Sequence, residues 1–105
     1  MSNPTEDAAD DAPDAFEEER IEAILDHLTE ANDSAVTFDD LESALLGVGG
    51  QYTKTPLAVY SASKMVDCFV KQGMTYEEAT EWYELNVACL WAGEHTPIIV
   101  EDRFD

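Results

Sequence analysis

The sequence predicts a small α+β domain in which a three-stranded sheet is covered on one face by helices, in the order α-β-β-α-α-β. The chain has 105 residues, enough for one modest hydrophobic core but not for two. Apolar residues recur at helical spacing in three segments, and three shorter apolar runs are typical of strands. A small sheet with helices on one of its faces is the simplest arrangement for these six elements.

The first element is a helix that we expect to span residues 15–30. Pro13 and Asp14 precede it, and the Asp14 side chain can accept hydrogen bonds from the first-turn amides. Its apolar residues recur at i, i+3, i+4 and i+7 and form one stripe: Ile21, Ile24, Leu25 and Leu28. Residues 1–13 hold only small, acidic and turn-forming types after Met1, so we expect a disordered acidic tail before a single domain over residues 14–105.

The domain core is expected between residues 41 and 100, and its first part allows two interpretations. Residues 37–51 are either a short helix or turn followed by a strand, or a strand throughout. We favour a turn or short helix to about Leu41 and a strand over residues 44–51, because the glycines at its end disfavour a helix. The run Gly47-x-Gly49-Gly50 lacks the Lys-Ser/Thr ending of a phosphate-binding loop.

Residues 56–60 predict a second strand, joined to the first by a hairpin connection. Ser61 or Ser63 then caps a helix that Gly73 ends. The strongest local signal follows, because Thr75 and Glu78 have the spacing of a capping box.

From this box we expect a helix that continues to Gly93. Its buried face is expected to hold Ala79, Trp82, Tyr83, Asn86, Val87 and Leu90. A turn at residues 94–97 then leads into a short buried strand, residues 98–100.

The balance of charge limits the classes of partner. The chain has 24 Asp and Glu residues against 5 Lys and Arg residues, a formal charge of −19. Nucleic-acid phosphates and anionic lipid headgroups would repel it, and no apolar run approaches the roughly 18–20 residues that cross a bilayer. We therefore expect no direct binding to nucleic acid or membranes. The first residues show no basic stretch followed by an apolar one, so we also expect no signal peptide and a cytoplasmic location.

The acidic residues concentrate in the first 40 positions. This part of the chain holds 14 acidic residues and one basic residue, a formal charge of −13. Four recur at every fourth position of the first helix and form a stripe of carboxylates: Glu18, Glu22, Asp26 and Glu30. Such neighbours destabilise a helix by about 0.2–0.5 kcal/mol per pair. The stripe suits a salty cytoplasm, or a partner with a basic surface towards which it would act as a DNA mimic. We favour salt adaptation, while the clustering keeps mimicry as the alternative.

A second set of residues suggests a pocket for a small ligand or substrate. Adjacent Glu94 and His95 could form an acid/base pair, and Tyr60 and Asn86 would complete the lining. The spacing matches no known metal site, so we expect no metal and no cofactor. For residues 93–97 we favour a capping glycine followed by a turn into an edge strand. Asn86 is expected to be buried and bonded to the backbone of the turn at residues 94–97 or to a strand edge.

The remaining chemistry-bearing residues are expected to be structural. Trp82, Tyr83 and Trp91 lie at helical spacing and are assigned to the core, with part of one of them exposed for a partner. Cys68 and Cys89 are expected to be buried free thiols, because the predicted helices place them too far apart for a disulfide.

The second half of the chain resembles a group of small uncharacterised proteins encoded in tailed-phage genomes and other mobile elements. The resemblance rests on five blocks: Pro56-Leu57-Ala58-Val59-Tyr60, residues 73–79 (GMTYEEA), Glu81-Trp82, Asn86-Val87 and residues 93–97 (GEHTP). It implies a viral or mobile-element origin but no reaction, and it leaves out the acidic first 40 residues.

Together these features favour a non-enzymatic, acidic, phage-related protein with halophilic adaptation that acts through protein–protein contact. The alternatives are a DNA-mimic inhibitor of a basic nucleic-acid-binding defence protein, and an enzyme or small-ligand binder that uses the pocket. Self-association in a structural role is a further alternative, because the sequence leaves the oligomeric state open.

Overall fold

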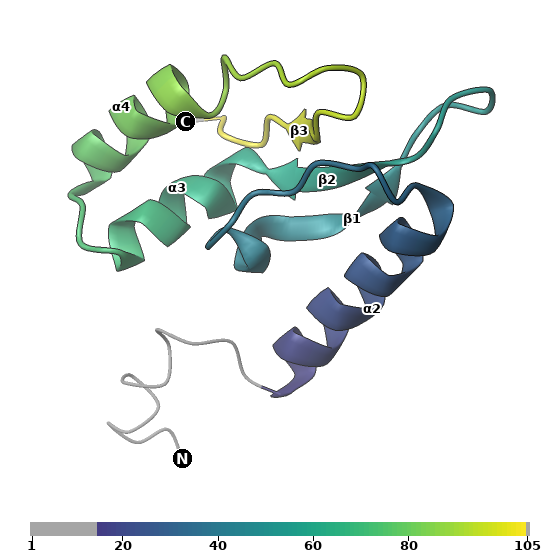
Figure 1. Ribbon diagram of the computed structural model, residues 1–105. Helices are drawn as coiled ribbons and strands as arrows, with labels where there is room; N and C mark the ends of the chain where they lie inside the picture. The colour runs from purple at the N-terminus through teal and green to yellow at the C-terminus, as the bar shows by residue number, and fades with distance from the viewer. Residues whose placement is uncertain (1–14, 105) are drawn as a thin grey trace.

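The computed structural model of the chain describes residues 15–104, so the predicted acidic tail lies outside the described residues. The elements are α2 (Ala15–Ala31), a 3₁₀ turn (Glu42–Ala44), β1 (Leu45–Gly49), β2 (Leu57–Ser61), α3 (Ala62–Lys71), α4 (Tyr76–Asn86) and β3 (Ile98–Val100) (Figure 1). This is the predicted order α-β-β-α-α-β, and the α+β fold is confirmed.

The three strands form one sheet in the order β1-β2-β3. β1 and β2 are an antiparallel hairpin, whereas β3 pairs parallel to β2 after the chain has passed through α3 and α4. Leu45, Tyr60 and Ile99 are register partners on the face that joins the core. On the opposite row Ile98 and Val100 are exposed, so the expectation of a fully buried last strand was wrong. Successive side chains of a strand point to opposite faces of the sheet, and in β3 only Ile99 packs against the core.

α2 packs against β1 through the predicted apolar stripe. Ile21 and Leu28 are buried, and the two other residues of the stripe are partly buried against the core. The Arg20 guanidinium donates from Nη1 to the carbonyl oxygen of Leu45 at 2.6 Å and pairs with Glu17 at 3.0 Å. The hydrogen bond to Leu45 therefore ties α2 to β1, while the ion pair with Glu17 lies within α2 itself.

The segment before β1 follows the interpretation of a turn and then a strand. The 3₁₀ turn buries Ala44, and the strand that follows ends at Gly49. Upstream, the Phe38 ring lies 4.9 Å from the Tyr60 ring, and the Phe38 amide donates to the Tyr60 hydroxyl at 3.0 Å. These two contacts hold the connection from α2 across the buried face of the sheet.

α3 and α4 begin at the caps that the sequence predicts. Ser61 rather than Ser63 caps α3, because its hydroxyl accepts from the Lys64 amide at 3.1 Å. Thr75 and Glu78 form the complete capping box of α4. Gly73 takes a φ of +115° between the two helices, a conformation that glycine adopts without strain.

α4 ends earlier than predicted. It stops at Asn86, and Gly93 lies well beyond it in a separate turn with a φ of +93°. The Thr96 hydroxyl accepts from the Ala92 amide and donates to the Gly93 carbonyl, both at 2.7 Å. These bonds turn the chain towards β3, so the left-handed glycine marks a loop and not the end of a helix.

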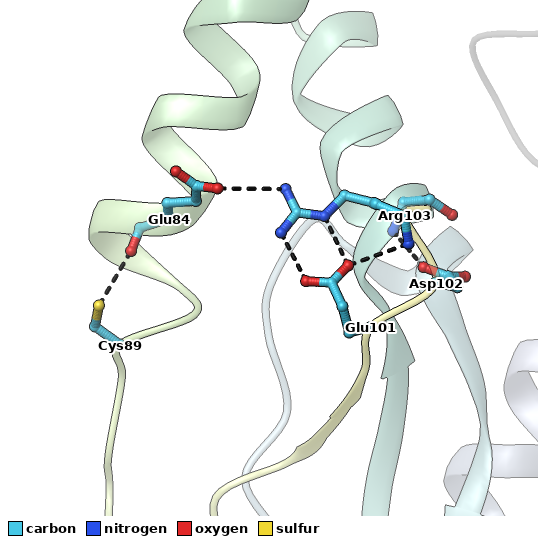
Figure 2. A network of polar contacts seen from close by, with 6 residues as sticks. Glu84, Cys89, Glu101, Asp102 and Arg103 are labelled. Atoms are coloured by element: carbon cyan, nitrogen blue, oxygen red, sulfur yellow. Dashed lines mark hydrogen bonds and ion pairs between the residues drawn. The ribbon is translucent and has the colours of Figure 1, made fainter. Parts of the chain in front are cut away.

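The segment after β3 is bound to both α3 and α4. Asp102 accepts from the Ser61 hydroxyl at 2.6 Å and from the Ser63 amide at 2.8 Å, so its carboxylate sits at the N-terminus of α3. A carboxylate is favourable there because the unpaired amides and the helix dipole are both positive. Arg103, beside it, reaches α4 (Figure 2).

The Arg103 guanidinium lies between an aromatic ring and two carboxylates. It is 4.8 Å from the centroid of the Tyr83 ring, and it donates to both carboxylate oxygens of Glu101 at 2.7 and 2.8 Å. Glu84 of α4 lies 3.7 Å from it (Figure 2). These hydrogen bonds lower the pKa of the Glu101 carboxyl and raise the pKa of Arg103.

The bonds at the start of α3 make stability depend on pH in the acid range. The hydrogen bonds from Ser61 and Ser63 lower the pKa of Asp102 below its ordinary value of 3.8. A carboxyl whose pKa is lowered by folding stabilises the protein above its ordinary pKa, and that contribution is lost as pH falls through the folded-state pKa.

We therefore expect Asp102→Asn to lower the free energy of unfolding at pH 7 by about 1–2 kcal/mol, because charge-assisted hydrogen bonds to the start of α3 are lost. The gap between variant and wild type should narrow below about pH 4. Urea denaturation across a pH series measures both effects. Asp39→Asn, which removes an exposed carboxylate, should stay within about 0.5 kcal/mol of wild type. A gap for Asp102→Asn that does not change with pH would contradict the assignment.

Candidate functional site

The outer face of α2 carries the predicted stripe of carboxylates. All four members are exposed to solvent: Glu18, Glu22, Asp26 and Glu30. They follow one another at single-turn intervals, a rise of about 6 Å per step. Arg20, the only base on this helix, is taken up by Glu17 and Leu45, and none of the four carboxylates pairs with a cation within residues 15–104. The stripe is therefore an uncompensated negative surface.

His95 has a structural partner that the sequence did not reveal. Asn32, whose side chain is only 7% exposed, donates from Nδ2 to the Pro56 carbonyl at 2.9 Å and contacts His95 Nδ1 at 3.0 Å. Its Oδ1 accepts from the Ser34 amide at 3.1 Å. Because these bonds fix the orientation of the amide, His95 Nδ1 accepts and the ring proton lies on Nε2.

The same histidine lines a hollow of about 510 Å³ between the β1–β2 connection and the segment that precedes β3. Glu94 also lines it, together with exposed Trp91 and with Lys54 of the connection. Its volume lies in the range of small-molecule sites, but Asn32 already holds one nitrogen of the imidazole. The hollow thus offers one acidic and one basic side chain, an imidazole and an exposed indole.

The other two residues of the predicted pocket lie elsewhere. Tyr60 is buried in the core, where desolvation raises the pKa of its hydroxyl, which accepts from Phe38. Asn86 is exposed and donates to the Trp82 carbonyl of its own helix. The expectation that Asn86 is buried and bonded to the turn at residues 94–97 was therefore wrong. The buried residues of α4 are Ala79 and Tyr83, and Asn86 is the last residue of the helix.

The aromatic and cysteine assignments also need correction. Of the three aromatics assigned to the core, only Tyr83 is buried, whereas Trp82 is 48% and Trp91 is 74% exposed. Both cysteines are free, as predicted, but Cys89 is exposed and Cys68 is half-buried. Burial raises the pKa of the Cys68 thiol, which therefore remains protonated near neutral pH.

No protein-family model, curated protein or solved structure matches the chain. Within residues 15–104, no three His, Cys, Asp or Glu side chains are grouped so that they could hold a metal ion. No helix in that part of the chain has the length and apolar character of a membrane span. Function therefore has to be inferred from the surfaces of this chain.

Three residues that hold these surfaces in place were missed by sequence reasoning. They are Asn32, Asp102 and Arg103. Each acts through a partner distant in sequence, namely His95, Ser61 and Tyr83 in turn. No local spacing could have found such pairs, although a polar residue next to an element boundary is a weak signal of capping.

The contacts of Asn32 predict a large effect of its removal. Asn32→Ala leaves the Pro56 carbonyl and His95 Nδ1 without their donor, so the free energy of unfolding should fall by about 2–3 kcal/mol. Asn86→Ala is the matched control, because that side chain bonds only within its own exposed helix; it should change stability by less than about 1 kcal/mol. Urea denaturation of both variants measures this. Equal effects of the two changes would refute the role given to Asn32.

Because the carboxylates of the stripe repel one another, we expect the free energy of unfolding to increase when their charges are removed. Changing all four members to their amides relieves three like-charge contacts, so at low salt the free energy of unfolding should increase by about 1 kcal/mol. The gain should vanish near 1 M salt, where screening shortens to about 3 Å.

The matched control removes four exposed carboxylates that lie outside α2, by changing Asp33, Asp39, Glu77 and Glu94 to their amides. Thermal or urea denaturation at two salt concentrations compares the two variants. A gain from the control as large as that from the stripe would mean that net charge, and not the spacing on α2, sets the repulsion.

Proposed function

We propose that this chain is a non-enzymatic acidic protein that works by binding another protein, and that the carboxylate face of α2 contacts a basic surface on that partner. The observation that carries the proposal is the exposed stripe, whose four carboxylates have no cation within ion-pair distance in residues 15–104. A basic partner would replace their mutual repulsion with attraction across the interface.

The distribution of charge supports a partner in addition to salt adaptation. α2 carries six acidic residues and one base within 17 residues, and that base is engaged by Glu17 and the Leu45 carbonyl. Adaptation to salt alone would spread carboxylates evenly over the surface. A concentrated negative face steers a positive partner during encounter, and this steering weakens as salt screens it.

The dispersal of the pocket residues supports binding over catalysis. Tyr60 is committed to Phe38, Asn86 to its own helix, and His95 to Asn32. General acid/base chemistry needs such groups to converge on one substrate position. We further propose a cytoplasmic protein of viral or mobile-element type, consistent with two free cysteines in a reducing compartment.

Affinity capture from the native host, at the salt concentration of its cytoplasm, tests the proposal. The full chain should retain a protein with a basic surface. The variant with amides at the four stripe positions should retain it at least about tenfold less, since each 1.4 kcal/mol of lost interaction is a factor of ten. The control variant with amides at Asp33, Asp39, Glu77 and Glu94 has the same net charge and should retain it normally. Equal losses from both variants, or none from either, would overturn the proposal.

The mimicry alternative has its own readout in the same experiment. If the captured protein binds DNA, the chain should displace duplex DNA from it in competition, and the stripe variant should not. Capture without displacement would leave protein binding supported and exclude the DNA-mimic version.

A further inference from the structure

α4 presents a second unpartnered surface, far from α2 in the fold (Figure 1). Four residues at i, i+3, i+4 and i+7 share its outer face, and Met74 lies at their base. With Met74 they line a hollow of about 410 Å³: Glu78, Glu81, Trp82 and Leu85. Trp82 is 48% and Leu85 is 69% exposed. We call this surface the α4 hollow.

The exposed apolar residues of the α4 hollow are not needed for folding. α4 packs into the core through its opposite face, where Ala79 and Tyr83 are buried. An indole and a leucine placed one turn apart in solvent leave apolar area that only a partner would cover. The hollow therefore has a concave shape and an apolar lining, two properties of binding surfaces.

The charge of the α4 hollow selects the kind of partner. Glu78 and Glu81 are its only charged lining residues, and no cation lines it. Glu78 uses one carboxylate oxygen for the Thr75 amide, and Glu81 makes no ion pair within residues 15–104. An apolar surface edged by carboxylates complements a cationic side chain with a long aliphatic stem.

The protein itself contains the arrangement that would fill the α4 hollow. Elsewhere on the same helix, Arg103 lies over the Tyr83 ring. It pairs there with Glu84 and Glu101 (Figure 2). The α4 hollow offers the same kinds of group, with Trp82 as the ring and Glu81 and Glu78 as the carboxylates, but no arginine lines it. Tryptophan binds cations more strongly than tyrosine does.

We propose that the α4 hollow binds an arginine side chain of a basic segment in a partner protein. The guanidinium stacks on the Trp82 indole and donates to Glu81 and Glu78, and its methylene stem covers Leu85 and Met74. Arginine suits this site better than lysine, because its planar fork both stacks and donates to two carboxylates. The site goes beyond the proposed function, since it lies on another helix and recognises one side chain instead of a basic surface.

A capped ten-residue peptide with four arginines and two leucines tests the site, with the same peptide carrying citrulline in place of arginine as its neutral control. In the full chain with Trp91→Phe, Trp82 is the only tryptophan, so its fluorescence reports on the α4 hollow alone. The arginine peptide should change this fluorescence saturably at 0.1 M salt, and the citrulline peptide should not. A response to both peptides, or to neither, would overturn the proposal.

Calorimetric titration of the same peptide separates this site from bulk charge. Glu81→Gln and Trp82→Leu should each weaken binding about fivefold to tenfold, a size typical of one partly desolvated cation–π or charge-assisted contact. Glu77→Gln removes the same charge from the same helix outside the hollow and should weaken binding less than about twofold. Glu78→Gln should weaken binding while keeping α4 folded, because glutamine also completes a capping box.

The outcome also distinguishes this site from the stripe on α2. If Glu81→Gln has no more effect than Glu77→Gln, and only the four-amide variant of α2 weakens binding, the α4 hollow is excluded and the proposed function stands. If the α4 variants weaken binding and the α2 variant does not, the arginine site stands and the contact assigned to α2 fails.

Discussion

The Asn32 carboxamide is the contact on which the arrangement of the domain depends most. It lies at the end of α2 and bonds at once to the β1–β2 connection at Pro56 and to the turn before β3 at His95. A buried amide with three partners cannot lose one of them without leaving a polar group unpaired. The direction of α2, the position of the hairpin connection and the approach to β3 are therefore set together. The acidic face of α2 projects from the domain because this junction fixes where the helix ends.

Local sequence signals allowed the helices and strands to be predicted. They did not predict every buried helix face or every helix end. The capping box at Thr75 and Glu78 and the stripe from Ile21 to Leu28 depend on neighbours within a turn or two, so sequence reading succeeded there. The end of α4 could not be predicted, because Thr96 redirects the chain through bonds across the loop and Gly93 also suits a helix cap. Asn86 and Trp82 were misplaced since a short helix with mixed composition has no clear apolar face until its neighbour is known.

The two candidate surfaces also differ in whether they could be predicted from the sequence. The carboxylate stripe on α2 could be predicted from the sequence. Its members recur every four residues, and the apolar stripe of the same helix faces the core, so the carboxylates have to face outward. The α4 hollow could not be predicted, because Trp82 and Leu85 were free to be core residues until packing placed Tyr83 inward. The two surfaces give the chain a diffuse negative face on one helix and a compact apolar and acidic site on another. In the two proposals above, long-range attraction and short-range recognition are assigned to separate elements.

The parallel pairing of β3 with β2 has a consequence for the order in which the domain forms. β1 and β2 meet through a short connection, and α3 and α4 are adjacent in sequence, so both pairs form with little loop-closure entropy. β3 can dock only after the whole crossover through both helices has closed, and it is held by three residue pairs and the bonds of Asp102 and Arg103. Non-local pairing of this kind is the slow event in folding. We expect β3 and the residues after it to be the last to assemble and the first to open, which would expose the free edge of β2 in both processes.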